Sequence, residues 1–154
     1  MSNYPPEPEL ASNEPIPVAC GIIRDVRGLF LISQRTDKQT LPLKWQFPGG
    51  KKKPGETIHT CLERELLEEL NLRVHLVDPE PYERHPITFD HGSFDLFYFF
   101  CFVSKPNLDK VLPLECNAIV LVQPWDLPSY DFLPMDKELA VRLARDFTVD
   151  GRTI

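Results

Sequence analysis

The sequence predicts an α/β (α+β) fold in which helices cover both faces of a mixed central sheet. Two observations lead to this class. Segment 94–103 is almost wholly apolar and rich in phenylalanine, which is typical of a strand buried on both faces of a sheet. Strand-like and helix-like segments also alternate irregularly along the chain, which favours a mixed sheet over a doubly wound parallel one. The expected architecture is therefore an α/β/α sandwich.

The elements of the first half of the chain follow from apolar runs and from the residues that bound them. Apolar runs at 18–24 and 29–33, separated by an Asp-Val-Arg-Gly turn, predict two strands with a tight connection. Segment 36–53 is rich in proline, glycine and lysine and predicts a loop. A helix is expected at 57–70, with Thr57 as its N-cap.

The second half of the chain supplies the rest of the sandwich. Short apolar segments at 74–77 and 118–122 predict two further strands, the second of them buried. Segment 136–147 has apolar residues at helical spacing and predicts a second helix. Together with the strand at 94–103, these elements provide a sheet and one helix for each of its faces.

Chain length and proline content predict the domain organisation. The chain has 154 residues, which suits one domain with a single core. Five of its 16 prolines precede Val18, and few apolar residues lie between them. We therefore expect a flexible, proline-rich tail at 1–13 and a single domain at 14–154.

Charge and cysteine usage narrow the class of protein. A net charge of −6 argues against broad attraction to nucleic acid, so no stable nucleic-acid partner is expected. The apolar run at 94–103 is too short to cross a bilayer, and no membrane association is expected. The four cysteines are widely spaced without a CxxC pair, and no signal-peptide pattern opens the chain. These features predict reduced thiols in a cytoplasmic protein.

The helix expected at 57–70 carries glutamates on the face that should be buried. On a helical wheel, Glu65 and Glu69 fall in the middle of the apolar arc and Glu68 falls at its edge. At ~4 Å and an effective dielectric of about 20, each pair of like charges costs about 4 kcal/mol. One interpretation is a solvated acidic helix end. The other is a site for a hard divalent cation, Mg²⁺ or Mn²⁺, which such oxygen ligands suit.

The segment before this helix favours the metal interpretation. Residues 47–56 read Phe-Pro-Gly-Gly-Lys-Lys-Lys-Pro-Gly-Glu. Glycines let the backbone approach a metal or a phosphate closely, and lysines supply positive charge beside the acids. A basic loop next to an acidic metal site suits a polyphosphate substrate, because the metal bridges carboxylates to phosphate oxygens.

The spacing of these residues resembles the Nudix box. Gly50 is followed by five residues, Glu56, seven residues and then 64–72, Arg-Glu-Leu-Leu-Glu-Glu-Leu-Asn-Leu. Every position matches except the last glycine, which is Asn71 here. Asparagine is the next-best residue for the left-handed conformation that follows a helix.

The flanking segments 18–35 and 45–51 resemble the MutT-like branch of this family. The resemblance implies a Nudix-type α/β/α sandwich with a mixed central sheet. It also implies Mg²⁺-dependent hydrolysis of nucleoside or deoxynucleoside triphosphates to the monophosphate and pyrophosphate. Removal of oxidised or non-standard nucleotides is one role that this branch suggests. The enzyme would be a monomer or a homodimer with a nucleotide as its substrate.

The resemblance also assigns the metal ligands and the catalytic groups. Glu65, Glu68 and Glu69 would hold the metal, with the Gly49 carbonyl as a further ligand. The wheel supports the three glutamates independently.

Two further residues receive catalytic roles. Arg64 would orient the glutamates through an ion pair, for instance with Glu56, which is also what a structural salt bridge would do. Either Glu65 or a later glutamate takes the proton from the attacking water. Glu115 stands where this branch places the later glutamate, although it equally fits a surface acid.

Five residues are candidates for substrate binding. Arg35 and Lys51 would contact phosphate, although Arg35 also fits an exposed strand end. Phe47 and Phe89 would meet the base, and Phe47 also fits a core position. Asp136 either reads an N–H-rich base edge, because an ionised carboxylate only accepts hydrogen bonds, or caps the following helix.

Two other functions stay open at this stage. The same chemistry could act on another nucleoside-diphosphate-linked substrate, such as an RNA 5′ end or a nucleotide sugar. The fold could also serve as a non-catalytic binding module, although such members usually lose the box glutamates that this chain keeps.

Overall fold

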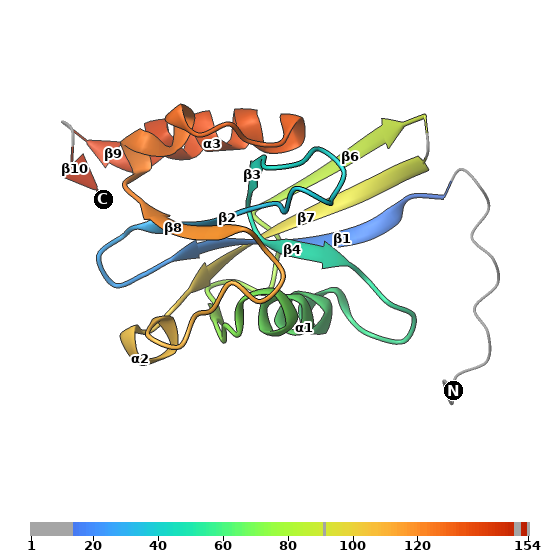
Figure 1. Cartoon of the computed structure of the whole chain (residues 1–154), viewed down its shortest axis with the longest axis horizontal. Helices are drawn as coiled ribbons and strands as arrows, with labels where there is room; N and C mark the ends of the chain where they lie inside the picture. Colours follow the sequence, from blue (N-terminus) through green and yellow to red (C-terminus); the bar gives the residue numbers. More distant parts are fainter. Residues whose placement is uncertain (1–13, 91, 150–151, 154) are drawn as a thin grey trace.

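A computed structural model describes residues 14–90, 92–149 and 152–153 (Figure 1). The tail predicted at 1–13 lies outside the described residues. In the described part, eight strands form one sheet. Its neighbouring strands are β3 (Trp45–Gln46), β2 (Phe30–Gln34), β1 (Ile16–Arg24), β7 (Gly92–Phe102) and β5 (His75–Leu76). Three further strands attach to this path: β4 (Gly49–Lys51) pairs with β1, β6 (Glu83–Phe89) with β7, and β8 (Ala118–Val122) with β2.

The sheet is mixed, as the sequence predicts. Strands β1 and β7 run parallel from the pair Ile16–Phe94 to the pair Arg24–Phe102, and the other pairings are antiparallel. The helical elements are α1 (Ile58–Leu70), α2 (Lys105–Leu108), η1 (Pro124–Ser129) and α3 (Pro134–Asp146). A short pair, β9 (Thr148–Val149) and β10 (Arg152–Thr153), follows α3.

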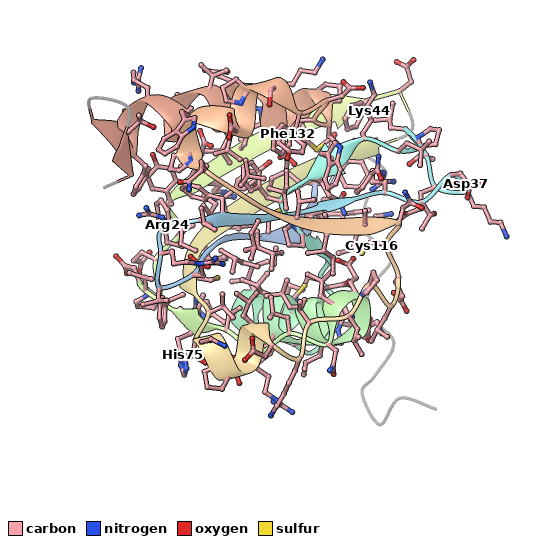
Figure 2. The ribbon with its side chains drawn as sticks, turned by 60° about the vertical axis from the view of Figure 1, so that its left-hand side comes forward. Arg24, Asp37, Lys44, His75, Cys116 and Phe132 are labelled. Carbon is pink, nitrogen blue, oxygen red and sulfur yellow. The ribbon has the colours of Figure 1, made fainter. Side chains whose placement is uncertain are left out.

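Helices cover both faces of the sheet, which confirms the predicted sandwich. Helix α3 lies on one face, and α1 lies on the other (Figure 1). The core divides accordingly. One cluster, which includes Tyr98 and Leu139, fills the α3 side, and the other, which includes Phe99 and Leu66, fills the α1 side. Figure 2 shows Phe132 among the side chains of the α3 layer.

Local signals define helix α1 at both ends. The Thr57 side chain accepts a hydrogen bond from the Thr60 N–H at 3.1 Å, and Asn71 adopts the left-handed conformation with φ of 51°. Between these caps, the buried side chains Cys61, Leu62, Leu66 and Leu70 recur on the face that packs against the sheet. The predicted helix and its cap residues are confirmed.

Two predictions about strands need correction. Segment 36–53 is not a continuous loop, because it contains β3 and β4. Strand β4 pairs with β1 so closely that a Cβ on Gly49 would lie 1.8 Å from the Ala19 carbonyl oxygen. Strand β8 is predicted as buried, but most of its residues are half-buried. The reason is that β8 pairs with β2 on one side and, among the described residues, with no strand on the other.

Strand β6 went unpredicted. Its sequence, Glu-Arg-His-Pro-Ile-Thr-Phe, is polar and contains Pro86, which is typical of an edge strand. It forms a hairpin with β7 and carries Phe89 at its end.

The structure describes all four cysteines and defines the lengths of the helices. Cys20, Cys61 and Cys101 are buried and Cys116 is half-buried, and all four are free. Among the described residues, no helix combines the length and the apolarity that crossing a bilayer requires.

The contact between β4 and β1 makes a testable prediction. Gly49→Ala forces a methyl group into the Ala19 carbonyl, and overpacking of this kind costs about 1–3 kcal/mol or more. The midpoint of thermal unfolding should therefore fall by several degrees. Gly21→Ala is the matched control, because its Cβ would meet the Ile23 side chain at 3.2 Å and needs only a small shift. Equal stability of Gly49→Ala and wild type would contradict this packing.

Candidate active site

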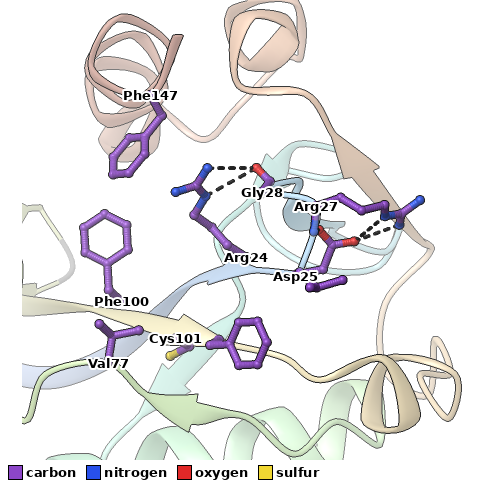
Figure 3. A pocket seen from close by; sticks show the side chains of 10 residues that line it. Arg24, Asp25, Arg27, Gly28, Val77, Phe100, Cys101 and Phe147 are labelled. Carbon is purple, nitrogen blue, oxygen red and sulfur yellow. Dashed lines mark hydrogen bonds and ion pairs between the residues drawn. The ribbon is translucent and has the colours of Figure 1, made fainter. Parts of the chain in front are cut away.

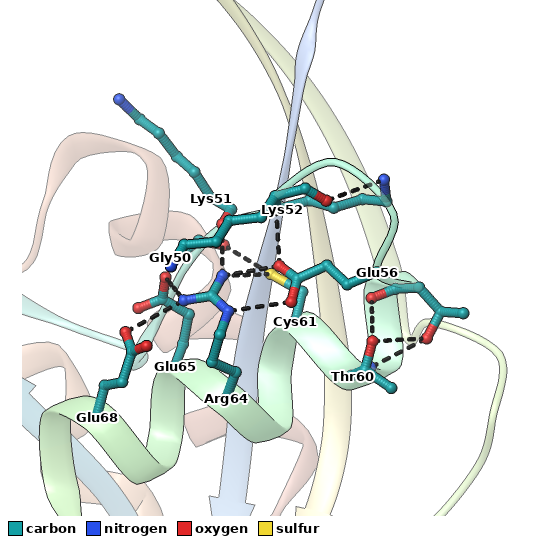
Figure 4. Close-up of polar contacts among 11 residues, drawn as sticks. Gly50, Lys51, Lys52, Glu56, Thr60, Cys61, Arg64, Glu65 and Glu68 are labelled. Carbon is teal, nitrogen blue, oxygen red and sulfur yellow. Dashed lines mark hydrogen bonds and ion pairs between the residues drawn. The ribbon is translucent and has the colours of Figure 1, made fainter. Parts of the chain in front are cut away.

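The site is built where helix α1 meets strand β4 (Figure 4). The Glu65 carboxyl group lies against the backbone of Gly50, and a Cβ on Gly50 would stand 2.2 Å from Glu65 Cδ. A side chain at this position would displace the Glu65 carboxyl group, so glycine is the residue that lets this carboxylate lie against the strand. The Cys61 thiol donates to the Gly50 carbonyl oxygen at 3.4 Å and ties the same strand to the helix.

One guanidinium organises the acids of this region. Arg64 donates to both carboxylate oxygens of Glu56, at 3.0 and 2.8 Å. It also donates to Glu65 Oε1 at 2.9 Å, to Glu68 Oε2 at 3.1 Å and to the Lys51 carbonyl at 3.0 Å (Figure 4). These hydrogen bonds raise the pKa of Arg64 above its usual range and lower the pKa of Glu56 to about 2. The predicted contact of Arg64 with Glu56 and the glutamates is present.

Of the three helix glutamates predicted as metal ligands, Glu69 is the one with which Arg64 forms no ion pair. Burial, followed by repulsion from Glu65, raises the pKa of the Glu69 carboxyl group to about 8, and Glu115 adds to the repulsion. A hydrogen bond from the backbone of Gly49 acts in the opposite direction. Glu65, Glu68, Glu69 and Glu115 are called the carboxylate cluster below.

The chain brings Glu115 to this cluster from 46 residues away. The backbone N–H groups of Leu114 and Glu115 donate to the Glu69 carbonyl at 2.9 and 3.1 Å. The loop before β8 is thereby fastened to the end of α1. The side chain of Glu115 is exposed to solvent. Its position agrees with the sequence prediction, and its role as a base stays a prediction.

The donor set of the cluster suits a hard divalent cation. Carboxylate oxygens are the ligands that Mg²⁺ and Mn²⁺ prefer, and a cation would relieve the repulsion that raises the Glu69 pKa. Within the described part of the chain, no three acidic, histidine or cysteine side chains already converge on one point. The reason is visible in Figure 4, where Glu65 and Glu68 both turn toward Arg64.

Arg35 is a residue for which the sequence predicts a contact with phosphate. Its guanidinium donates to the Thr40 carbonyl and hydroxyl oxygens at 2.7 and 3.0 Å, and to Gln46 Oε1 at 3.2 Å. Burial lowers the pKa of Arg35, and the negative charge of Glu69 opposes that shift. Arg35 is therefore within electrostatic reach of the cluster.

Lys51 and Phe89 both contact Phe94, which the sequence analysis did not single out. The Lys51 ammonium lies 5.4 Å from the centre of the Phe94 ring, and Phe94 meets Phe89 edge-on at 5.9 Å. Two predicted substrate-binding residues are thus joined by Phe94. The sequence signal was present, because Phe94 opens the long aromatic run, but the run alone does not say which ring faces which neighbour.

Phe47 lies in the core. Its side chain is 2% exposed, stacks on Phe132 at 5.2 Å and meets Tyr98 edge-on at 6.5 Å. Of the two alternatives for Phe47, the structure shows the core position. A contact of Phe47 with the base stays a prediction.

Asp136 does not cap helix α3, so that alternative was wrong. The helix begins at Pro134, with Leu133 as the N-cap and no side-chain cap, because proline is well tolerated at the first helical position. The carboxylate accepts instead from the Tyr98 hydroxyl at 2.5 Å and from the Phe47 N–H at 3.1 Å. Burial raises the pKa of Asp136 to about 6, although both hydrogen bonds lower it. Sequence reasoning missed Tyr98.

A pocket of about 520 Å³ lies apart from the cluster, at the end of β1 beside the β1–β2 turn (Figure 3). Its Arg24 guanidinium lies 4.5 Å from the centre of the Phe147 ring and donates to the Gly28 carbonyl oxygen. Its Asp25 carboxylate accepts from Arg27. The charges of this pocket are therefore satisfied within the protein, and no predicted site residue lines it.

An α/β/α sandwich with a carboxylate cluster backed by glycines, and with cationic side chains beside it, is the arrangement of an enzyme that hydrolyses phosphoric anhydrides. Comparison with protein families agrees. The family model described as the NUDIX domain matches residues 14–143. The chain therefore belongs to the NUDIX family, whose members generally need a divalent metal ion.

Individual relatives agree with this assignment. The chain is 37% identical over 131 residues to the 8-oxo-dGTP diphosphatase of Haemophilus influenzae, covering 85% of this chain and 93% of that protein. It is 26% identical over 121 residues to the nucleoside triphosphatase NudI of Escherichia coli, covering 74% of this chain and 86% of that protein. Its fold is similar to that of the MutT protein of Methanosarcina mazei, with a TM-score of 0.72 at 21% identity over 88% of this chain and 97% of that one.

The ion pair between Arg64 and Glu56 predicts a pH dependence of stability. The folded-state pKa of Glu56 lies below its ordinary value of 4.5, at about 2. The resulting stabilisation is present above pH 4.5 and is lost as the pH falls toward 2. Arg64→Gln removes it, so the difference in unfolding midpoint between wild type and variant should be largest above about pH 5 and should shrink toward about pH 2.

The matched control is Arg145→Gln, which removes an exposed arginine paired with its neighbour Asp146. Exposed pairs contribute little to stability because water and salt screen them, so this variant should unfold close to wild type at every pH. A difference for Arg64→Gln that stays constant across the same pH range would show that Glu56 does not carry the effect.

Proposed function

We propose that the protein is a Mg²⁺-dependent pyrophosphohydrolase that converts nucleoside or deoxynucleoside triphosphates to the monophosphate and pyrophosphate. The observation that carries the proposal is the carboxylate cluster, in which Arg64 holds Glu65 and Glu68 while the pKa of Glu69 is raised by burial and by its acidic neighbours. Arg35 lies within electrostatic range of Glu69, and Lys51 directly follows Gly50 on β4. Both would provide positive charge for the phosphates.

Glu65, Glu68 and Glu69 would hold the metal, with the Gly49 carbonyl as a further ligand. Magnesium, or manganese in its place, would neutralise charge on the phosphate oxygens and activate the attacking water. The chain itself holds the ligands in place. Gly50 lets Glu65 approach the strand, and Arg64 restrains Glu65 and Glu68.

Water attacks a phosphorus atom of the triphosphate. A new P–O bond forms to the water oxygen, the P–O bond that joins the α- and β-phosphoryl groups breaks, and one water proton passes to a base. We assign the base to Glu115, because its side chain is exposed to solvent while Glu65 is already engaged by Arg64. Arg35 and Lys51 would bind the phosphate oxygens.

The substrate class follows from the relatives and from the site. One relative is named for 8-oxo-dGTP and another for nucleoside triphosphates in general. We propose a sanitising role in which oxidised or non-standard nucleotides are removed. RNA 5′ ends and nucleotide sugars are the second candidate, because the same box chemistry serves other nucleoside-diphosphate linkages. A purely binding module is disfavoured, because the box glutamates are present and clustered.

The setting of the enzyme is also a proposal. We propose a cytoplasmic enzyme that works as a monomer or a homodimer without a stable nucleic-acid partner. The net charge of −6 and the free thiols support this view.

Magnesium should stabilise the metal-free protein through the cluster. Binding to the folded state alone adds about 2.7 kcal/mol at a concentration 100 times Kd, which raises the unfolding midpoint by several degrees. Glu69→Gln should lose most of this rise. Glu63→Gln is the matched control, since Glu63 is exposed on the same helix outside the cluster and should respond to magnesium like wild type. No rise in wild type would contradict the metal site.

Hydrolysis itself is tested with a substrate panel. We expect wild type in Mg²⁺ to release pyrophosphate from one or more of the four dNTPs, 8-oxo-dGTP and 5-methyl-dCTP. Glu68→Gln should lower the rate roughly 10–100-fold or more, while Glu63→Gln keeps it. Release of pyrophosphate from triphosphorylated RNA, or of a nucleoside monophosphate from a nucleotide sugar, without hydrolysis of the nucleoside triphosphates would favour the second candidate. Equal rates for wild type and Glu68→Gln would refute the proposed site.

A further inference from the structure

Strand β8 leaves one edge of the sheet open. All five of its residues pair with β2 and, among the described residues, no strand pairs with its other side. In an antiparallel pair, alternate residues direct their backbone N–H and C=O groups away from the partner, so β8 presents hydrogen-bonding groups along that side. Its sequence, Ala-Ile-Val-Leu-Val, has no charge and no proline. An apolar edge of this kind favours pairing with another strand.

The edge strand at the opposite side of the sheet is built differently. Strand β6 carries Glu83, Arg84, His85 and Pro86 in succession. Charged side chains and proline are the residues with which proteins prevent pairing at a sheet edge. The chain therefore protects one edge of its sheet and leaves β8 available to a partner.

Apolar side chains gather beside the open edge. Leu112 and Leu114, in the loop before β8, are 51% and 55% exposed, and Trp125, just after β8, is 41% exposed. A hollow of about 310 Å³ lies along the strand on the α1 side, and Leu108 lines it together with 119–121. Specific interfaces bury about 1,000 Å² or more, so these side chains would add the area that one short strand lacks.

The strand is complementary to a second copy of itself. An antiparallel pair centred on Val120 sets Ile119 opposite Leu121 of the second copy, and Ala118 opposite Val122. Ile119 and Leu121 face the α1 side, whereas Val120 and Val122 face the α3 side. Opposed side chains therefore share a face and are apolar throughout, which stabilises a strand pair.

The positions that flank the strand match as well. The same register sets Asn117 opposite Gln123 of the second copy and Glu115 opposite Trp125. Amide meets amide, and no two like charges are opposed. Because the contact repeats about a two-fold axis, it closes on itself as a dimer and does not propagate.

We propose that two copies of the chain form a homodimer in which their β8 strands pair antiparallel about a two-fold axis at Val120, so that the two sheets become one continuous sheet. Glu115 lies three residues before β8, so each carboxylate cluster stands beside the interface. The pairing itself does not depend on the proposed function, because it uses the edge of β8 and not the chemistry of the cluster.

The mass of the full chain in solution is the first measurement. Light scattering after gel filtration should give twice the mass of one chain at micromolar concentration. Val120→Lys sets two ammonium groups against each other on the axis, and Val120→Glu sets two carboxylates there. Each should raise the dissociation constant of the dimer roughly tenfold or more, because like charges that face each other across an interface repel. An equimolar mixture of the two variants should recover the dimer.

Val141→Lys is the matched control for an added charge. Val141 is 55% exposed on α3 and lies outside this edge, so the variant should stay dimeric.

Val120→Cys tests the register with a smaller change. Residues opposed in an antiparallel pair have Cα atoms about 4.5–5.5 Å apart, which a disulfide can span. In an oxidised glutathione buffer, this variant should form a covalent dimer that a reductant separates. Val141→Cys is its control and should form no crosslink.

Three results overturn the inference. Wild type with the mass of one chain throughout the micromolar range excludes the dimer. A Val120→Lys dimer as stable as that of wild type shows that the copies meet through another surface. A Val120→Cys dimer without a crosslink shows that the strands do not oppose each other at this residue. Should the charged variants not fold, Val120→Cys decides, because cysteine is close to valine in size. Hydrolysis of nucleotides by wild type is measured separately, so none of these results decides the proposed function.

Discussion

The structure of the site depends on one guanidinium that is shared among three carboxylates. Arg64 binds Glu56, Glu65 and Glu68 through charge-assisted hydrogen bonds, which are stronger than neutral ones. It does not reach Glu69, whose burial and negative neighbours keep its pKa high. The chain thus supplies enough positive charge to order the glutamates and too little to neutralise them. A divalent ion at the proposed site would correct that deficit.

The two glycines of β4, Gly49 and Gly50, also help to position the carboxylates, because they allow close contacts that a side chain would prevent. Gly49 lets β4 lie against the Ala19 carbonyl, and Gly50 lets the Glu65 carboxylate reach the strand backbone. At Gly49 the backbone of β1 leaves no room for a side chain, and at Gly50 a side chain would displace the Glu65 carboxyl group. The box spacing therefore reflects a packing constraint as well as a chemical one. A methyl group at either position would separate the carboxylates from the strand that backs them.

Features specified locally were predictable, and features that depend on distant partners were not. The caps of α1 are set by Thr57 and Asn71, so the sequence predicted them correctly. Strand β4 and the polar edge strand β6 exist because β1 and β7 pair with them, and short-range patterns carry no record of that pairing. Apolar spacing predicts a helix that begins at 136, and this start makes Asp136 a cap candidate. The helix in fact begins two residues earlier, at Pro134. Tyr98 was missed because a strand apolar on both faces does not show which side each residue takes.

Strand β1 links the two halves of the site. Successive residues of a strand point to opposite faces, so Ala19 packs toward α1 and the carboxylate cluster while Cys20 packs toward α3 and Asp136. A slip of one residue would exchange these environments and place a thiol against the metal side. Pairing on both edges prevents the slip, because Cys20 lies opposite Gly49 on β4 and opposite Tyr98 on β7. The register that aligns the glycines with the helix glutamates is therefore also the register that brings Tyr98 to Asp136. The carboxylate cluster and the buried contact of Tyr98 with Asp136 therefore both depend on the register of a single strand.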